Sequence, residues 1–279
     1  MRKRPANRGF SACLMAGLFL VGLSGAQAQP VPKRVVSINV CTDQLAMVLA
    51  QDGQLRSVSN LARDPLMSVM ADKADRLPVN RAQAEEVFLL QPDLVLAGTF
   101  SSRATVGLLR QLGVRVEEFA PARNFEDIMA HMERMGTLLG REDEARKQIA
   151  AMKTALAAIR KPAHRRTVAL YYANSYTAGR GTLIDDAVRR AGLDNLTEKL
   201  GIRGSATLPL ELLVVEKPDM IVRSSRGQAP ALAFENFQHP ALHALGTEAR
   251  MISLADNLTV CGGPFSVEAV AQLAEAARE

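Results

Sequence analysis

The segment Glu85–Val95 reads EEVFLLQPDLV, and the segment Glu211–Ile221 reads ELLVVEKPDMI. Each begins with a glutamate, continues as an apolar run with helical character, and ends in a Pro-Asp turn followed by a strand-forming stretch. The spacing from the glutamate to the proline is seven residues in both segments. Because the unit occurs once in each half of the chain, the sequence predicts two duplicated lobes.

Strand patterns alternate with helical patterns on both sides of these units. In the first half, strands are predicted at 34–39, 55–59, 93–96 and 114–118, with helices at 43–49, 85–90 and 105–112. In the second half, strands are predicted at 168–172 and 220–222, with helices at 182–191, 210–215 and 266–277. This alternation is typical of an α/β fold with mostly parallel sheets.

The stretch 124–160 differs from both halves. It contains no proline, its apolar residues recur at helical spacing, and Pro162 ends it. It predicts one long helix, or two helices bent at Gly140. The expected limits are therefore 33–122 for the N-terminal lobe, 123–161 for the interlobe helix and 165–279 for the C-terminal lobe.

Residues 1–28 have the three parts of a secretory signal peptide. Arg2, Lys3 and Arg4 form a positive start, Phe10–Leu23 is apolar, and Ala26-Gln27-Ala28 offers the small residues that signal peptidase reads. The apolar run is too short to span a bilayer comfortably. We therefore expect this leader to be cleaved and the mature protein to be soluble in the periplasm.

The charge balance argues against a nucleic-acid partner. The chain has 34 Lys and Arg residues against 29 Asp and Glu residues. Four of the cations (Arg2, Lys3, Arg4 and Arg8) lie in residues 1–28, which contain no acid, so removing these four leaves 30 basic against 29 acidic residues. A nearly neutral mature chain offers no basic face for nucleic acid. We expect a monomer.

Three further stretches complete the pattern: Pro32–Ser37, Gly179–Asp186 with Ala191-Gly192 after it, and His239–Leu242. With the twin units, the helical middle and the leader, they resemble the periplasmic binding proteins for vitamin B12 and ferric siderophores. The resemblance covers essentially the whole mature chain. It implies two α/β lobes, each with a mostly parallel sheet flanked by helices, joined by a single long rigid helix, with a ligand cleft between the lobes.

The resemblance also implies a role and partners. It implies a solute-binding protein that is not an enzyme, has no intrinsic cofactor, and delivers a small-molecule metal chelate to an ABC permease in the inner membrane. A rigid interlobe helix would limit closure of the lobes. The sequence has no Gly-x-x-x-x-Gly-Lys-Ser/Thr loop, so the chain is not the ATPase of such a system.

Candidate ligand-binding residues lie in loops that follow the predicted strands, where parallel sheets meet their ligands. They are Cys41, Arg63, Arg81, Phe100, Arg103, Tyr176, Arg180, Arg223 and Cys261. Arginine suits the anionic oxygens of a ferric siderophore, although a single arginine is more often a solvated surface residue. Phe100 and Tyr176 would line an apolar wall of the cleft or pack between elements.

Glu85 and Glu211 begin equivalent helices of the two lobes. An acid in the first helical turn is favoured by the helix dipole, which is one explanation. The resemblance implies another, which we favour: residues at these positions dock onto arginines of the permease.

The ligand class stays open at this point. A ferric siderophore is favoured slightly over a cobalamin-type corrinoid because of the loop arginines, and haem is the alternative. A less favoured reading is an exported two-lobed α/β enzyme acting on a metal chelate, which would need cofactor cysteines or a His/Glu site that the sequence lacks. The four histidines do not form a metal-binding pattern, so no metal site is expected.

Cys41 and Cys261 are the two cysteines outside the leader. The oxidising periplasm favours a disulfide, which requires α-carbons within about 7 Å and would clamp the lobes together at one point. The alternatives are free thiols that line the cleft, or buried structural cysteines. The sequence leaves all three open.

Overall fold

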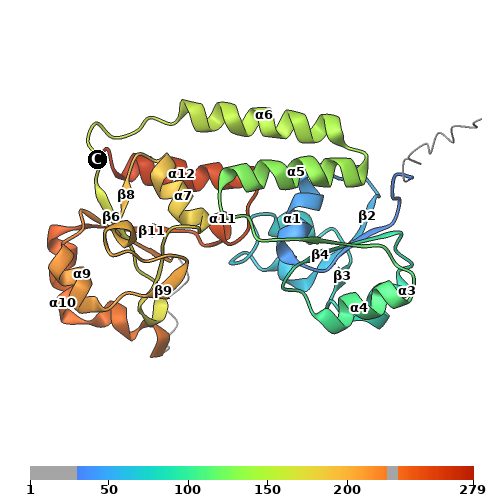
Figure 1. Ribbon diagram of the computed structural model, residues 1–279, viewed down its shortest axis with the longest axis horizontal. Helices are drawn as coiled ribbons and strands as arrows, with labels where there is room; N and C mark the ends of the chain where they lie inside the picture. The colour runs from blue at the N-terminus through green and yellow to red at the C-terminus, as the bar shows by residue number, and fades with distance from the viewer. Residues whose placement is uncertain (1–29, 225–231) are drawn as a thin grey trace, which may run out of the picture. The chain divides into compact units, whose positions relative to one another are not determined.

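The structure is a computed structural model that describes residues 30–224 and 232–279. The predicted signal peptide at 1–28 lies outside these residues. Residues 31–279 form one unit, which is described below (Figure 1). Across the described part of the chain, no helix combines the length and the apolar character needed to cross a bilayer.

The first lobe is built on a five-stranded parallel sheet, as the alternating pattern predicted. Its strand order is β3-β2-β1-β4-β5. The strands are β1 (Val35–Ser37), β2 (Leu55–Ser59), β3 (Val79–Asn80), β4 (Leu94–Gly98) and β5 (Val116–Phe119). The helices are α1 (Val40–Leu49), η1 (Asn60–Arg63), α2 (Ala71–Ala74), α3 (Ala84–Leu89) and α4 (Arg103–Gln111). Every residue of β1 and β4 is buried, because helices cover both faces of the sheet.

The second lobe contains a four-stranded parallel sheet of order β11-β10-β6-β8 and a separate antiparallel pair, β7 and β9. The strands are β6 (Thr167–Leu170), β7 (Tyr176–Ala178), β8 (Asp194–Asn195), β9 (Ser205–Thr207), β10 (Met220–Ser224) and β11 (Arg250–Leu254). The helices are η2 (Ala173–Ser175), α7 (Leu183–Arg190), α8 (Leu196–Lys199), α9 (Leu210–Glu216), η3 (Leu232–Gln238) and α10 (Pro240–Glu248). The chain ends with α11 (Asn257–Val260), η4 (Pro264–Ser266) and α12 (Val267–Ala276).

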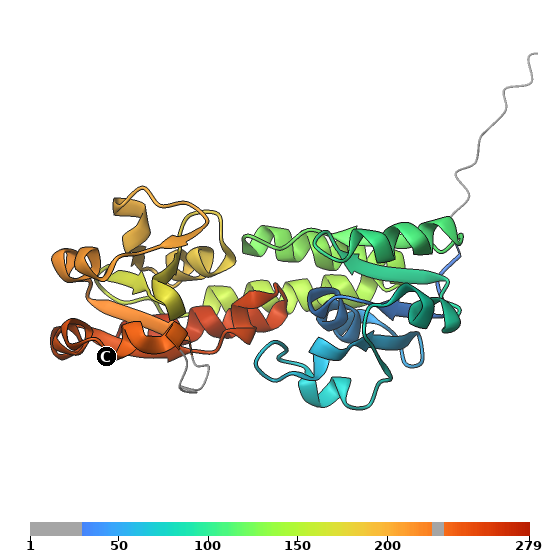
Figure 2. The ribbon, with the colours of Figure 1, turned by 90° about the horizontal axis from the view of Figure 1, so that it is seen from below.

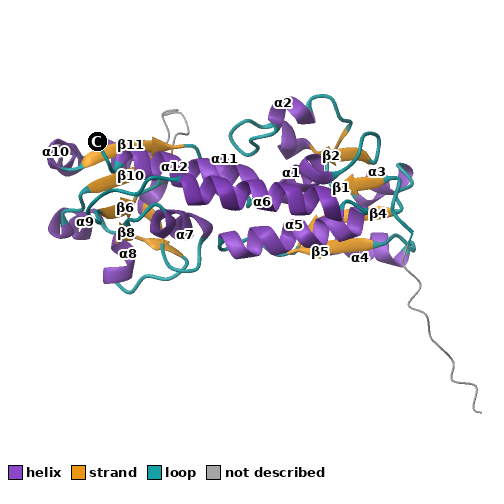
Figure 3. Cartoon of the chain, turned by 90° about the horizontal axis from the view of Figure 1, so that it is seen from above, coloured by secondary structure: helices purple, strands orange, loops and turns teal. Residues whose placement is uncertain are grey.

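The stretch between the lobes contains two helices, α5 (Phe125–Leu139) and α6 (Glu142–Ala158). The prediction of a single long helix is therefore wrong, and the alternative break at Gly140 is confirmed. Gly140 ends α5 in the left-handed region, with φ of 64°, which reverses the chain. A Cβ on Gly136 would come within 2.6 Å of Ala145, so this glycine lets the two helices lie side by side (Figure 3).

The twin Pro-Asp turns have the same local structure in both lobes. The carboxylate of Asp93 accepts the backbone N–H groups of Lys33 and Arg34, at 2.8 and 2.9 Å, just before β1. The carboxylate of Asp219 accepts the N–H of Thr167, at 2.6 Å, at the start of β6. In each lobe, the aspartate that precedes one strand (β4 or β10) thus binds the backbone at the start of the neighbouring strand (β1 or β6).

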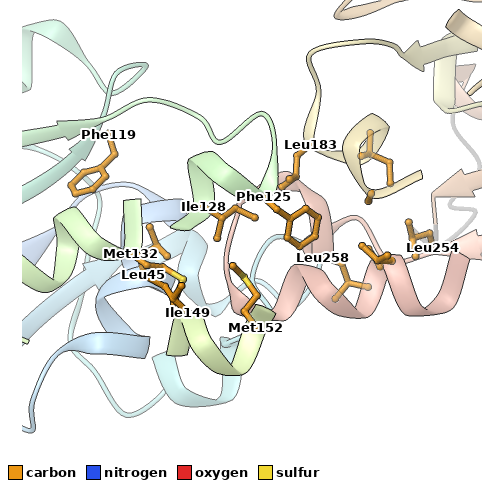
Figure 4. Packing of buried hydrophobic residues seen from close by; sticks show 14 of the residues in the cluster. Leu45, Phe119, Phe125, Ile128, Met132, Ile149, Met152, Leu183, Leu254 and Leu258 are labelled. Atoms are coloured by element: carbon orange, nitrogen blue, oxygen red, sulfur yellow. The ribbon is translucent and has the colours of Figure 1, made fainter. Parts of the chain in front are cut away.

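One apolar core extends through both lobes and the helices between them. Figure 2 shows the two lobes apart from each other, with helices of the green and red parts of the chain between them. It includes Leu45 of α1, Met132 of α5 and Ile149 of α6, and it continues to Leu183 of α7 and Leu258 of α11 (Figure 4). Helix α6 contacts both α5 and α12, which extends the packing toward the chain end. Closely packed interiors resist deformation, so this core couples the positions of the two sheets.

We expect Asp93→Ala and Asp219→Ala each to lower the free energy of unfolding by about 1 kcal/mol, because charge-assisted hydrogen bonds are removed at an exposed position, two at Asp93 and one at Asp219. Chemical denaturation measures the change. Asp52→Ala is the control, since Asp52 is exposed in a turn and should change stability by less than about 0.5 kcal/mol. Equal losses for all three variants would contradict the role given to the Pro-Asp turns.

A second expectation concerns Asp43 of α1, which is fully buried. Burial raises the pKa of Asp43 from 3.8 to about 6, although hydrogen bonds from Ser37 and Ser59 oppose the shift. The folded state therefore binds the proton more tightly than the unfolded state does. Consequently, this group's contribution to stability is greatest at low pH and is lost as the pH rises from about 4 to about 6.

The Asp43→Asn variant lacks this titration. Between pH 7.5 and pH 4.5, we expect wild type to gain roughly 2 kcal/mol of unfolding free energy relative to Asp43→Asn, since one pKa unit corresponds to about 1.4 kcal/mol. Paired urea denaturation curves at the two pH values measure this difference. A constant difference between the two proteins across that range would show that Asp43 titrates normally.

Candidate functional site

The carboxyl ends of β1, β4 and β5 border a hollow of about 150 Å³, here called the first hollow. Ligands of parallel sheets bind at such ends. Its walls also include part of α5 and the segment after α11. The residues that face it include Asn39, Thr42, Phe100, Phe119, His131 and Val260.

A second hollow, of about 440 Å³, lies at the carboxyl ends of β6, β10 and β11. Its walls include Tyr172, Tyr176, Ser224, Phe234, Asp256 and Thr259. Val260 borders both hollows. Since they share this wall residue and each lies at the ligand-binding edge of one sheet, we treat them as the two halves of one cleft.

Cys41 and Cys261 form a disulfide, with 5.0 Å between their α-carbons and 220 residues between them in the sequence. Both residues line the first hollow. Of the three possibilities that the sequence left open, the structure therefore has the disulfide, and it lies in the cleft wall. It links the first turn of α1, in the first lobe, to the segment that follows α11.

The loop after β1 is shaped by Asn39, which caps α1. Its side-chain oxygen accepts the N–H of Cys41 at 3.0 Å, which fixes the first turn of the helix beside the hollow. Gly98, at the end of β4, faces the same asparagine. A Cβ at Gly98 would come within 2.8 Å of the Asn39 amide nitrogen, so only glycine fits there without a shift.

His131 brings an imidazole to the first hollow from inside α5. Its ring meets that of Phe119 edge to face, with centroids 5.6 Å apart. Burial lowers the pKa of His131, the charge of Asp127 raises it, and the charge of Arg134 lowers it further. Because the net shift is downward, the ring is neutral at neutral pH, and one of its two nitrogens is then unprotonated.

The second hollow has one carboxylate among its described wall residues, that of Asp256. Ser224 donates its hydroxyl hydrogen to Asp256 at 2.5 Å. Burial raises the pKa of Tyr172, and the negative charge of Asp256 raises it further, so the phenol stays protonated. In the described residues, no three His, Cys, Asp or Glu side chains form a group that could hold a metal ion.

Four of the predicted ligand-binding residues lie in the cleft walls. Cys41, Phe100 and Cys261 line the first hollow, and Tyr176 lines the second. Phe100 is 86% exposed and Tyr176 is 50% exposed, so both rings have free surface at the mouth of the cleft.

The five predicted arginines do not line either hollow. Arg63 donates to the carbonyl oxygens of Ala74 and Leu77, at 3.3 and 2.6 Å, and so holds the end of α2. Arg180 forms an ion pair with Glu198 at 3.1 Å.

The other three arginines lie away from the walls. Arg81 is exposed before α3, and Arg223 is half-buried on β10. Arg103 borders a different hollow on α4, together with Arg110 and Glu118. Placement after a strand was therefore a poor guide to which cationic side chains reach the cleft.

Several wall residues were not among the predicted ones. Tyr172 follows β6 closely, so the rule about strand ends could have found it. Asp256 was missed because β11 was not recognised as a strand. His131 lies within a helix, and no loop-based rule selects it.

Glu85 and Glu211 occupy the first turns of α3 and α9 and are exposed. An exposed aliphatic residue follows each of them by four positions, Leu89 at 80% and Val215 at 74% exposure. Residues four apart lie on one helix face. Each lobe thus presents an acid and an aliphatic side chain together.

Residues 35–246 match the family described as periplasmic binding protein. A cobalamin-binding protein of Halobacterium salinarum is 28% identical over 202 residues, which are 68% of this chain and 53% of that protein. The chain thus spans about half the length of this relative. An uncharacterized ABC transporter substrate-binding lipoprotein of Bacillus subtilis, YvrC, is 24% identical over 258 residues, 88% of this chain and 79% of that protein.

Two solved structures illustrate the shared fold. The periplasmic heme-binding protein RhuT of Roseiflexus sp. RS-1 superposes with a TM-score of 0.73 at 22% identity, covering 88% of this chain and 98% of that one. The vitamin B12 binding protein BtuF of Vibrio cholerae gives 0.62 at 17% identity, covering 88% and 96%. The arrangement of parallel sheets flanked by helices is therefore a known architecture.

Proposed function

The chain belongs to the periplasmic binding protein family, and from this premise we propose that it is the substrate-binding component of an ABC importer. Its ligand in this proposal is a metal tetrapyrrole of the corrinoid class. The observation that carries the proposal is the cleft with aromatic walls at the carboxyl ends of both sheets. The signal-peptide pattern at 1–28 fits export to the periplasm.

The chemistry of the walls supports a large, partly apolar ligand. Phe100, Tyr176 and Phe234 offer ring surface to the cleft. Aromatic side chains bury large areas and stack on flat conjugated groups, which suits a tetrapyrrole macrocycle. The cobalamin-binding relative from Halobacterium salinarum agrees with this choice.

The earlier preference for a ferric siderophore depended on loop arginines. Those arginines lie outside the two hollows. Without those arginines in the walls, the preference for an anionic iron chelate loses its support, and the aromatic surface of the walls favours a corrinoid.

Haem is the second candidate, because His131 offers a neutral imidazole to the first hollow. Imidazole is a common axial ligand of haem iron. A comparison of cyanocobalamin, haemin and ferrichrome in a thermal-shift assay distinguishes the classes. A ligand at a hundred times its dissociation constant should stabilise the protein by about 2.7 kcal/mol.

Binding without chemical conversion is part of the proposal. The residues in the cleft walls offer ring surface, one imidazole and one carboxylate. Incubation of the purified protein with the bound chelate, followed by mass spectrometry of the released ligand, should return it unchanged.

In this proposal, delivery uses Glu85 and Glu211, which dock onto arginines of the permease. Their exposure in both lobes supports this role. Leu89 and Val215, one helical turn further on, would add apolar contact area beside each charge.

We expect Phe100→Ala and Tyr176→Ala each to weaken cyanocobalamin binding about five- to fiftyfold, since truncation removes roughly 1–2.3 kcal/mol of aromatic burial. Isothermal titration measures the affinity. Phe88→Ala is the matched control, because Phe88 is a partly exposed aromatic on α3 that lines neither hollow. Loss of affinity in Arg81→Ala or Arg103→Ala, with both cleft aromatics neutral, would restore the siderophore interpretation.

Docking is tested separately from binding. We expect the double variant Glu85→Ala/Glu211→Ala to keep its ligand affinity and to lower uptake into cells about tenfold, equivalent to roughly 1.4 kcal/mol of lost association. Radiolabelled uptake at saturating ligand measures this effect. Glu133→Ala, an exposed acid on α5, should behave as wild type. Unchanged uptake by the double variant would remove both glutamates from the docking surface.

A further inference from the structure

The segment 255–263, here called the strap, connects β11 to η4 and contains α11. It contributes to both halves of the cleft. Cys261 and Gly262 line the first hollow, Asp256 and Thr259 line the second, and Val260 lines both. The geometry of the whole cleft therefore depends on where the strap lies.

The backbone hydrogen bonds at the centre of the strap are local. The N–H groups of Leu258, Thr259 and Val260 donate to the carbonyl oxygens of Ala255 and Asp256 within the same segment. In the part of the chain that the structure describes, no sheet ladder includes strap residues. Its place against the first lobe must be fixed by side chains.

Three contacts hold the strap against residues that precede it by more than a hundred positions, in the first lobe and α5. The amide of Asn257 donates to the carbonyl oxygen of Pro65 at 2.8 Å. Gly262 packs so closely that a Cβ would come within 2.6 Å of both Ala122 and Ile128. The third contact is covalent, the disulfide from Cys261 to Cys41.

The disulfide is attached to firm structure at its first-lobe end. Cys41 belongs to the first turn of α1, which is held by the cap from Asn39. Cys261 is 1% exposed, so its position is also set by packing. The bond therefore fixes Cys261, and with it the neighbouring Val260, relative to α1.

We propose that the Cys41–Cys261 disulfide is a positioning element of the ligand site, one that fixes the strap as the common wall of both hollows. This inference rests on the proposed function for its effect on affinity, and on the contacts alone for its effect on the strap. A wall held in place before binding needs no ordering when the ligand arrives, so the disulfide raises affinity through pre-organisation.

A purely stabilising cross-link makes a different prediction. Such a bond acts mainly on the unfolded chain by restricting its freedom, and it leaves the native cleft unchanged when it is removed. The two roles are separated by measurements on the folded protein.

The test uses Cys41→Ser/Cys261→Ser beside Leu109→Ala. Leu109 is fully buried in a separate core cluster of the first lobe, so its truncation destabilises the protein away from the strap. We expect the double cysteine variant to bind cyanocobalamin, or haemin if that is the better probe, at least about tenfold more weakly than wild type. Leu109→Ala should bind within about twofold of wild type.

Hydrogen exchange supplies a readout that needs no ligand. We expect amides of 255–263 to exchange at least about tenfold faster in the double cysteine variant, with β4 and β10 unchanged. Wild type that binds neither probe would refute the proposed function, while the exchange result would still decide the role of the disulfide. Strap exchange equal to that of wild type would overturn the positioning role.

The same exchange measurement on folded wild type reduced with a phosphine covers the case in which the double variant does not fold. Mass spectrometry verifies that each sulfur has gained one hydrogen, while the phosphine is oxidised to its oxide. Faster exchange confined to the strap supports the proposal. Faster exchange spread evenly over both sheets would identify the disulfide as a general stabiliser and overturn it.

Discussion

The backbone N–H of Phe125 donates to the buried carboxylate of Asp186 at 3.0 Å, and the arrangement of the cleft depends on this junction. Phe125 begins α5, which leaves the first lobe, whereas Asp186 belongs to α7 of the second. Arg190 donates to the same carboxylate at 2.8 Å and lies over the ring of Phe125. A buried carboxylate that has lost its partners would be costly, so the junction resists separation of α5 from α7.

The continuous core and the disulfide act in the same direction as this junction. The core passes from Leu45 through Ile149 to Leu258, so moving one sheet relative to the other would open voids in packed apolar contacts. A cleft framed in this way has its walls in place before a ligand arrives. Binding then costs little ordering, and selectivity comes from the shape and chemistry of fixed walls rather than from large closure.

The fold could be anticipated from local patterns because those patterns have local causes. The Pro-Asp turns were visible in the sequence, and Asp93 and Asp219 carry the hydrogen bonds that make them structural. The break at Gly140 was one of two alternatives, and choosing it requires the close contact that Gly136 permits with Ala145. The cleft residues were harder to predict, because a side chain lines the cleft only if it points toward it. Arg63 follows a strand yet turns to carbonyl oxygens at the end of α2 and just after it, whereas His131 reaches the cleft from a helix.

The molecule has two kinds of surface that could recognise a partner, one mainly apolar and one charged. The cleft walls are mainly aromatic and aliphatic, so the favourable term there is burial of apolar surface, which salt does not screen. In the proposed docking, the exposed carboxylates of Glu85 and Glu211 would act through charge, over distances comparable with a Debye length of about 8 Å at physiological ionic strength. Capture of ligand and the proposed docking onto a permease would therefore respond to different conditions. Because the core is rigid, ligand capture in the cleft need not alter the exposed surface around the two glutamates. A binding protein built in this way can hold its ligand firmly while its association with an importer stays reversible.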